Sequence, residues 1–171
     1  MTNRERSAQE PHDGYEQALQ RVGSERERRL PAECSEERIK EMKSILLSLK
    51  PEWWELMKSG EKTLEIRKSR PRDIDLPARV LVYLPKPEGR IVGEFQAGHF
   101  LKTDKPGGLV KRSMVPLQQL EEYAKDGLLY GWKVDGVVEY DIHQPLDSIG
   151  VERAPQSWMY VDIPTEWPEC I

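Results

Sequence analysis

Short apolar segments separated by glycine and proline constrain the fold of this 171-residue chain more than any other feature. Their lengths and their content of β-branched and aromatic residues predict strands at residues 45–49, 62–68, 79–84, 91–100, 132–142 and 158–163. In the same region, Pro51 at the start and Gly60 at the end predict a short helix at 51–60, and helical spacing occurs at 116–126. Five or six short strands with two flanking helices predict an α+β fold, a small mixed β-barrel, in preference to a doubly wound sheet.

Glycines mark the expected turns and bends. Gly60 can end the first helix in a left-handed conformation, and Gly127 is the expected end of the second. Gly93 and Gly98 predict bulges or sharp curvature in the fourth strand. The segment KTDKPGG, residues 102–108, is typical of a loop.

The first 42 residues differ in composition from the rest of the chain. They contain 8 Lys and Arg against 10 Asp and Glu, with few clustered apolar residues. Such a segment cannot bury enough apolar area to offset its ordering entropy, so residues 1–42 are predicted to be a flexible tail with some helical character at 35–43. The folded domain is then expected at 43–163, followed by a short C-terminal tail at 164–171.

The sequence gives no sign of a membrane segment or a metal site. No apolar run is long enough to span a bilayer, and the N-terminus lacks the apolar region of a secretory signal. Cys34 and Cys170 have no CxxC partner, and the three histidines lack metal-ligand spacing. We therefore expect no metal, no cofactor, no membrane partner and a reduced, cytoplasmic setting.

The net charge of −4 conceals a strong asymmetry along the chain. Residues 67–112 hold 11 Lys and Arg against 5 Asp and Glu, whereas residues 113–171 hold 3 against 11. A chain divided in this way can present a basic face to a polyanion while it remains acidic in total. The alternative is that the two halves interleave in space and their charges cancel. The sequence leaves both open.

The segment GEKTLEIR, residues 60–67, carries many charges for a strand. Side chains alternate along a strand, so its aliphatic residues fall on one face while Glu65 and Arg67 share the other. Glu65 can orient Arg67, and together with Lys62 they could hold a phosphate, a carboxylate or a base. The simpler interpretation from the residues alone is a solvated strand face whose charges favour solubility.

GEKTLEIR also resembles the GxKxxExR signature of ASCH domains, which are PUA-like barrels named after a homology region of a transcription coactivator. The resemblance extends from residue 45 to about residue 162. It includes ILLSLKPEWWELMKSGEKTLEIRK, the hairpin ARVLVYLPKPEGRIVGEF and the late segment RAPQSWMYV. The flanking strand, helix and hairpin make the match more specific than the octapeptide alone.

In this family the signature residues line a cleft that is thought to hold RNA or a nucleotide-like ligand. The resemblance therefore implies a site at Lys62, Glu65 and Arg67. Further binding candidates flank this unit or lie in nearby loops: Lys50, Lys68, Arg70, Gln156 and Ser157. The last two can equally be turn residues before a strand. The basic loop RKSRPR, residues 67–72, could follow a phosphate backbone or be a solvated turn.

The resemblance implies a protein that binds RNA or a nucleotide-like ligand, with a regulatory role in transcription or translation. The alternative is a hydrolase acting on RNA or a modified nucleoside, because some relatives are N4-acetylcytidine amidohydrolases. In those, a lysine, a threonine three residues later and a distant glutamate are thought to act. This chain keeps Lys62 but has Glu65 in place of the threonine, and Thr63 should point to the opposite face. This departure favours binding, and Lys62 and Glu65 would be the catalytic pair if the protein is an enzyme.

Aromatic residues and the tail supply two weaker indications. Five aromatic side chains are candidates for stacking on unpaired bases, although core packing is the simpler interpretation of each: Trp53, Trp54, Tyr83, Tyr130 and Trp132. A third possible function is a regulatory interaction module whose charged tail engages a protein partner.

Overall fold

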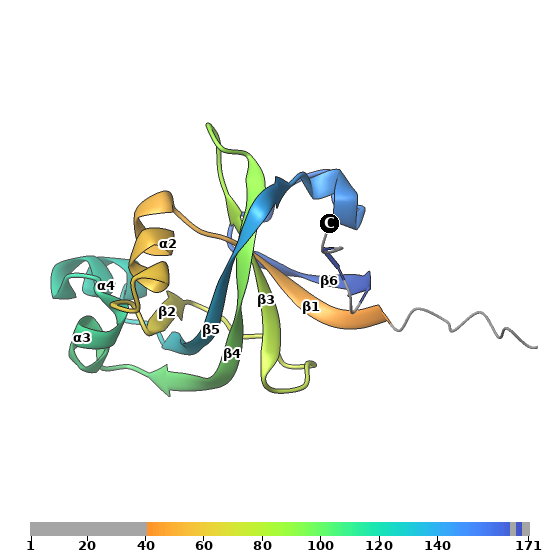
Figure 1. Cartoon of the computed structure of the whole chain (residues 1–171). Coiled ribbons are helices and arrows are strands. Elements are labelled where there is room, and N and C mark those ends of the chain that lie inside the picture. The colour runs from red at the N-terminus through yellow and green to blue at the C-terminus, as the bar shows by residue number, and fades with distance from the viewer. Residues whose placement is uncertain (1–40, 165–166, 169–171) are drawn as a thin grey trace, which may run out of the picture. The chain divides into compact units, whose positions relative to one another are not determined.

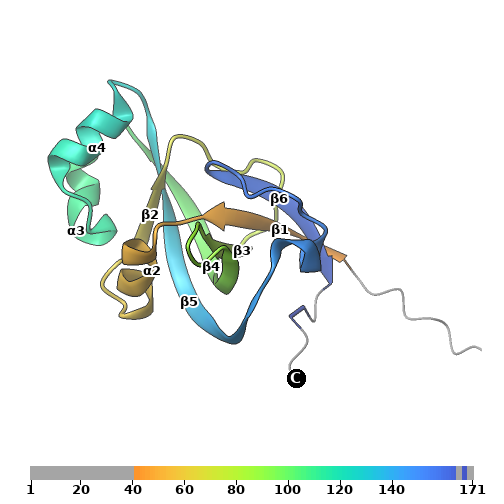
Figure 2. The same ribbon diagram turned by 90° about the horizontal axis from the view of Figure 1, so that it is seen from above.

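The computed structural model describes residues 41–164 and 167–168, which form one mixed six-stranded sheet with three α-helices (Figures 1 and 2). The strands are β1 (Glu41–Ser48), β2 (Leu64–Arg67), β3 (Ala78–Leu84), β4 (Arg90–Thr103), β5 (Leu129–Gln144) and β6 (Trp158–Pro164). The helices are α2 (Pro51–Lys58), α3 (Val110–Ser113) and α4 (Leu117–Ala124), with 3-10 turns at Pro106–Leu109 and Leu146–Ile149. The predicted α+β class is confirmed.

The strand order is β2-β5-β4-β3-β1-β6, with β1 and β3 parallel and all other neighbours antiparallel. The edge strands β2 and β6 do not pair with each other, so the sheet is open and the expected barrel is not closed. The three helices gather beside β2 (Figures 1 and 2). Strand β5, from the acidic segment 113–171, pairs with β4 of the basic segment 67–112, so the two segments are neighbours in the sheet.

Strands β1 and β3 form the centre of the structure because both of their faces are buried. Ile45 and Leu47 point into one apolar cluster with Trp54 of α2, whereas Leu46 of the same strand points into a second cluster with Val161 of β6. This explains why the sequence of β1 is a continuous apolar run rather than an alternating one. A third cluster joins β2 to the α3–α4 region.

Helix α2 leads directly into the charged strand. Pro51 begins it, and Trp54 and Met57 anchor it to the core. Gly60 then adopts a φ of 80°, as its predicted helix-ending role requires, and the Lys62 amide donates to the Leu56 carbonyl at 2.8 Å. This reversal sends the chain into β2 beside the helix that precedes it.

Three local predictions were wrong. The predicted helical character at 35–43 fails at Glu41–Lys43, which pair with β6, and residues 35–40 lie outside the described residues. The expected loop at 102–108 instead continues β4 to Thr103 and forms a 3-10 turn. Helix α4 ends before Gly127, because Lys125 takes a left-handed φ of 47° and its amide donates to the Glu121 carbonyl.

Several other expectations concern residues outside the described range. They include residues 1–40 of the predicted N-terminal tail, most of the predicted C-terminal tail, and both cysteines. Across residues 41–164 and 167–168, no helix is long and apolar enough to cross a membrane. The same residues contain no cluster of three or more His, Cys, Asp or Glu side chains that could hold a metal ion.

The predicted bends in β4 coincide with shifts of its register against β5, at Gly93 and between Ala97 and Phe100. At Gly93 a Cβ atom would lie 2.2 Å from the Val138 carbonyl oxygen and 2.8 Å from the Trp54 ring. The absent side chain therefore lets α2 pack directly on the sheet.

Replacing Gly93 by alanine should lower the free energy of unfolding by about 1–3 kcal/mol or more, because neither backbone nor indole can move freely. Urea denaturation followed by tryptophan fluorescence measures the change. Gly107→Ala is the control, since nothing lies within 4 Å of its added Cβ, and it should stay within about 0.5 kcal/mol of wild type. Equal effects of the two substitutions would contradict this account of the α2–sheet contact.

Candidate functional site

A cleft of about 420 Å³ lies where α2, β2, α4 and the end of β1 meet. Its walls combine charged, aromatic and aliphatic side chains. The lining residues are Ser48, Leu49, Lys50, Trp53, Lys62, Glu65, Ile66, Arg67, Pro85, Val115, Gln119, Leu120, Tyr123 and Gln156. The predicted site residues Lys62, Glu65 and Arg67 therefore lie together on one wall of this cleft.

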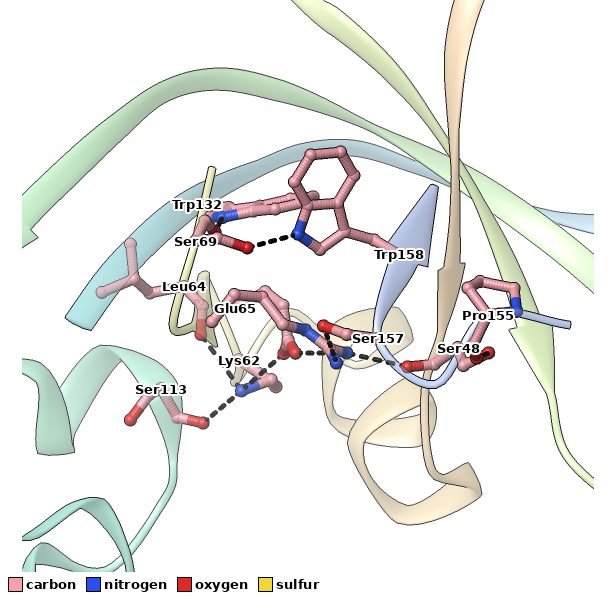
Figure 3. A network of polar contacts seen from close by, with 11 residues as sticks. Ser48, Lys62, Leu64, Glu65, Ser69, Ser113, Trp132, Pro155, Ser157 and Trp158 are labelled. Atoms are coloured by element: carbon pink, nitrogen blue, oxygen red, sulfur yellow. Dashed lines mark hydrogen bonds and ion pairs between the residues drawn. The ribbon is translucent and has the colours of Figure 1, made fainter. Parts of the chain in front are cut away.

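Lys62 is buried, with 1 % of its side chain exposed. Its Nζ donates to the Ser113 carbonyl oxygen at 2.7 Å and to the Leu64 carbonyl oxygen at 3.1 Å, and it lies 3.2 Å from Glu65 Oε2 (Figure 3). Because an ammonium group has three N–H donors, these three acceptors satisfy it completely. Lys62 thus ties β2 to the end of α3.

Glu65 accepts from a cation on each side. Its Oε2 faces Lys62, and its Oε1 lies 2.9 Å from Arg67 Nη2. Only 6 % of the Glu65 side chain is exposed, so the carboxylate is a buried anion held between two buried or nearly buried cations. Strand alternation had predicted that Glu65 and Arg67 share a face, and the structure confirms this.

Arg67 connects β2 to the opposite edge of the sheet. Its Nη2 donates to the Ser48 carbonyl oxygen at 2.8 Å, and its Nη1 donates to Ser157 Oγ at 3.3 Å (Figure 3). Ser48 ends β1, and Ser157 immediately precedes β6. We call the gap between the unpaired edges of β2 and β6 the seam. It is bridged by Arg67 and by Ser69, which follows β2.

Ser69 accepts hydrogen bonds from two indole N–H groups at the seam. Trp132 Nε1 donates to the Ser69 carbonyl oxygen at 3.2 Å, and Trp158 Nε1 donates to Ser69 Oγ at 3.0 Å (Figure 3). The two indole rings also meet edge to face, with centroids 5.6 Å apart. Side-chain contacts therefore hold the two edges together where no strand ladder does.

Burial lowers the pKa of Lys62 below its ordinary value of 10.5, although the adjacent Glu65 carboxylate acts in the opposite direction. Burial therefore disfavours the charged form of Lys62, whereas the three acceptors around its ammonium group stabilise that form.

Four of the remaining predicted residues line the cleft or contact a residue that lines it, and Arg70 does neither. Lys50 and Gln156 line the cleft at its exposed rim. Ser157 contacts Arg67, and Lys68 lies 4.9 Å above the ring centroid of Tyr123, which lines the cleft. Arg70 is exposed and donates to the Pro71 carbonyl, outside the cleft lining.

Of the five aromatic stacking candidates, the structure brings one to the cleft. Trp53 lines it, with its ring centroid 5.0 Å from Lys62 Nζ. Trp54, Tyr83 and Trp132 are buried core residues, which agrees with the simpler interpretation. Tyr130 packs against the core from its edge.

Sequence reasoning missed the contribution of α4. Gln119 and Tyr123 line the cleft, and the Ser113 carbonyl before this helix holds Lys62. The helical spacing of 116–126 could have indicated that Tyr123 lies on an apolar face, but not that this face adjoins β2. The Ser48 and Ser113 acceptors are main-chain carbonyls, which carry no residue-specific signal.

Solved structures with a similar fold are ASCH proteins. The structure of ASCH from Zymomonas mobilis superposes with a TM-score of 0.60 at 21 % identity, covering 69 % of this chain and 87 % of that one. Serine-to-alanine and tyrosine-to-phenylalanine forms of ASCH from the same organism give 0.60 and 0.59 at 20 % identity. They cover 69 % of this chain and 87 % and 89 % of their own chains. The ASCH/PUA-like fold that the signature implied is therefore present. No family model and no curated protein matches the chain.

Replacing Glu65 by glutamine should destabilise the protein by about 3 kcal/mol or more, because it leaves two inward-facing cations without their counter-ion. Denaturant unfolding measures the loss. Glu121→Gln is the matched control, since that glutamate is exposed on α4 and forms no ion pair within the described residues, and it should change stability by less than about 0.5 kcal/mol. If Glu65→Gln is as mild as the control, the buried ion pairs do not hold the cleft wall.

The lowered pKa of Lys62 predicts a pH dependence. Between its pKa in the native protein and 10.5, the unfolded chain binds more protons than the folded chain at this position. The unfolding free energy of wild type should therefore rise relative to that of Lys62→Met as the pH increases through this interval. Parallel urea unfolding series on both proteins, from neutral pH to about pH 10, measure the difference. A difference that stays constant or falls contradicts the assignment.

Proposed function

We propose that this chain is an ASCH-type module that binds RNA or a nucleotide-like ligand in the cleft beside β2. The observation that carries the proposal is the buried Lys62–Glu65–Arg67 wall, which lines a hollow rather than a solvated strand face. The similarity in fold to ASCH from Zymomonas mobilis supports it. The setting would be the reduced cytoplasm inferred from the isolated cysteines.

The size and chemistry of the cleft suit such a ligand. A volume of about 420 Å³ falls in the range of small-molecule sites and is large enough for one nucleotide. Trp53 and Tyr123 supply aromatic faces, on which unpaired bases stack. Lys50 at the rim and the neighbouring Lys68 are exposed cations that can attract phosphates.

Binding is better supported than hydrolysis. A lysine that activates a nucleophile or a water needs a free position on its nitrogen, and the three acceptors around Lys62 Nζ leave none. Thr63 does not line the cleft, and the residue three positions after Lys62 is a carboxylate rather than a hydroxyl. We therefore propose a regulatory binding role rather than an amidohydrolase or ribonuclease.

Fluorescence anisotropy with a short labelled single-stranded RNA tests the proposal. Affinity should fall steeply as salt rises, since phosphate contacts release counterions. Lys50→Ala should weaken binding several-fold and lower the salt slope by about one, whereas Lys105→Ala, an exposed cation outside the cleft lining, should do neither. Absence of RNA binding, or equal effects of the two substitutions, would refute an RNA site in this cleft.

A second assay separates binding from hydrolysis. If the protein only binds, incubation of the purified protein with N4-acetylcytidine, and separately with labelled RNA, should leave both intact. Turnover that is lost in Lys62→Ala but kept in Lys105→Ala would replace the binding proposal with a hydrolase.

A further inference from the structure

The cations on the cleft wall are largely committed to the protein itself. All three donors of Lys62 have protein acceptors. Arg67 Nη2 is shared between Glu65 and the Ser48 carbonyl, and its Nη1 donates to Ser157. A phosphate at this wall would find few free donors, and it would lie beside the Glu65 carboxylate, which repels an anion.

The Glu65 carboxylate on the wall retains capacity for a ligand. A carboxylate offers about four lone-pair positions, and the described residues use one on each oxygen of Glu65. Arg67 Nε is buried and has no hydrogen-bond partner among the described residues. An orphaned buried donor is costly unless a ligand or a water satisfies it. The wall therefore offers an acceptor at Glu65, and an N–H group on the edge of a nucleobase complements it.

The aromatic and cationic side chains of the cleft differ in how deeply they lie. Trp53 lies directly over the buried Lys62, next to the wall. Tyr123 is exposed and lies beneath the exposed Lys68, and the Lys50 side chain is 73 % exposed. An aromatic ring thus lies next to the wall, and the exposed ammonium groups among the residues that line or border the cleft are Lys50, 3.9 Å from Glu52, and Lys68 over Tyr123.

From this arrangement we propose that the nucleobase of the ligand, rather than its phosphate, occupies the inside of the cleft. An unpaired nucleobase bearing an N–H donor enters to the Glu65 carboxylate between the aromatic side chains, and its phosphates remain at the rim with Lys50 and Lys68. The inference rests on the proposed function and names what that function leaves open, namely which part of the nucleotide the site recognises. Bases specify binding here, and phosphates supply attraction that salt screens.

The test compares two labelled single strands of equal length and equal phosphate number. One is an RNA of mixed sequence, and the other carries reduced abasic sugars in place of every nucleoside. The abasic strand should bind the wild-type protein roughly tenfold more weakly or worse, since base–aromatic stacking and the base-edge hydrogen bonds are lost. A mononucleoside should compete with the RNA, whereas ribose 5-phosphate at the same concentration should not.

A fold-neutral pair of variants adds a second readout at the exposed Tyr123. Tyr123→Phe keeps the ring and should keep the preference for RNA over the abasic strand, whereas Tyr123→Leu should reduce it. The outcomes separate the two proposals. RNA binding with equal affinity for the abasic strand would overturn the inference that the nucleobase occupies the inside of the cleft and leave RNA binding intact. Failure of both strands and the nucleoside to bind would overturn both proposals.

Discussion

The ion pairs of Glu65 with Lys62 and Arg67 are the interaction on which the rest of the site depends. Three charged side chains within residues 62–67 are buried or nearly buried, and burial of unpaired charge is costly. Each cation also donates to another part of the fold: Lys62 to the end of α3, and Arg67 to the end of β1 and the segment before β6. The charges at and just before β2 thereby connect the elements that enclose the cleft.

The cleft lies beside β2, one of the two unpaired edge strands of the open sheet. Strands β2 and β6 end the strand order without pairing, and residues of β2 line the cleft together with residues of α2 and α4. The seam is held instead by Arg67 and by the two indole N–H groups on Ser69 (Figure 3). Arg67 belongs to both features, because it bridges the seam and also lines the cleft.

Local patterns in the sequence correctly predicted features that depend on neighbouring residues alone, such as strand faces and turns. Strand alternation placed Glu65 and Arg67 on one face, and the Gly60 turn was expected from helix-ending chemistry. The expected end of α4 at Gly127 failed because Lys125 adopts the left-handed conformation that glycine usually supplies. The burial of the charges at residues 62–67 could not be read locally, because it depends on carbonyl groups 19 and 51 residues away and on a helix brought beside β2 by the tertiary fold. The signature suggested a site, but only the assembled structure shows that its lysine has no free donor.

A crystal structure of the protein with a bound trinucleotide would test the central claim most directly. The account predicts one base inside the cleft with an N–H group within hydrogen-bond distance of a Glu65 carboxylate oxygen, and phosphates outside near Lys50 and Lys68. The contacts of Lys62 with the Ser113 and Leu64 carbonyls should be unchanged from the present structure. A phosphate seated against Lys62 and Arg67, with those internal contacts broken, would contradict the account.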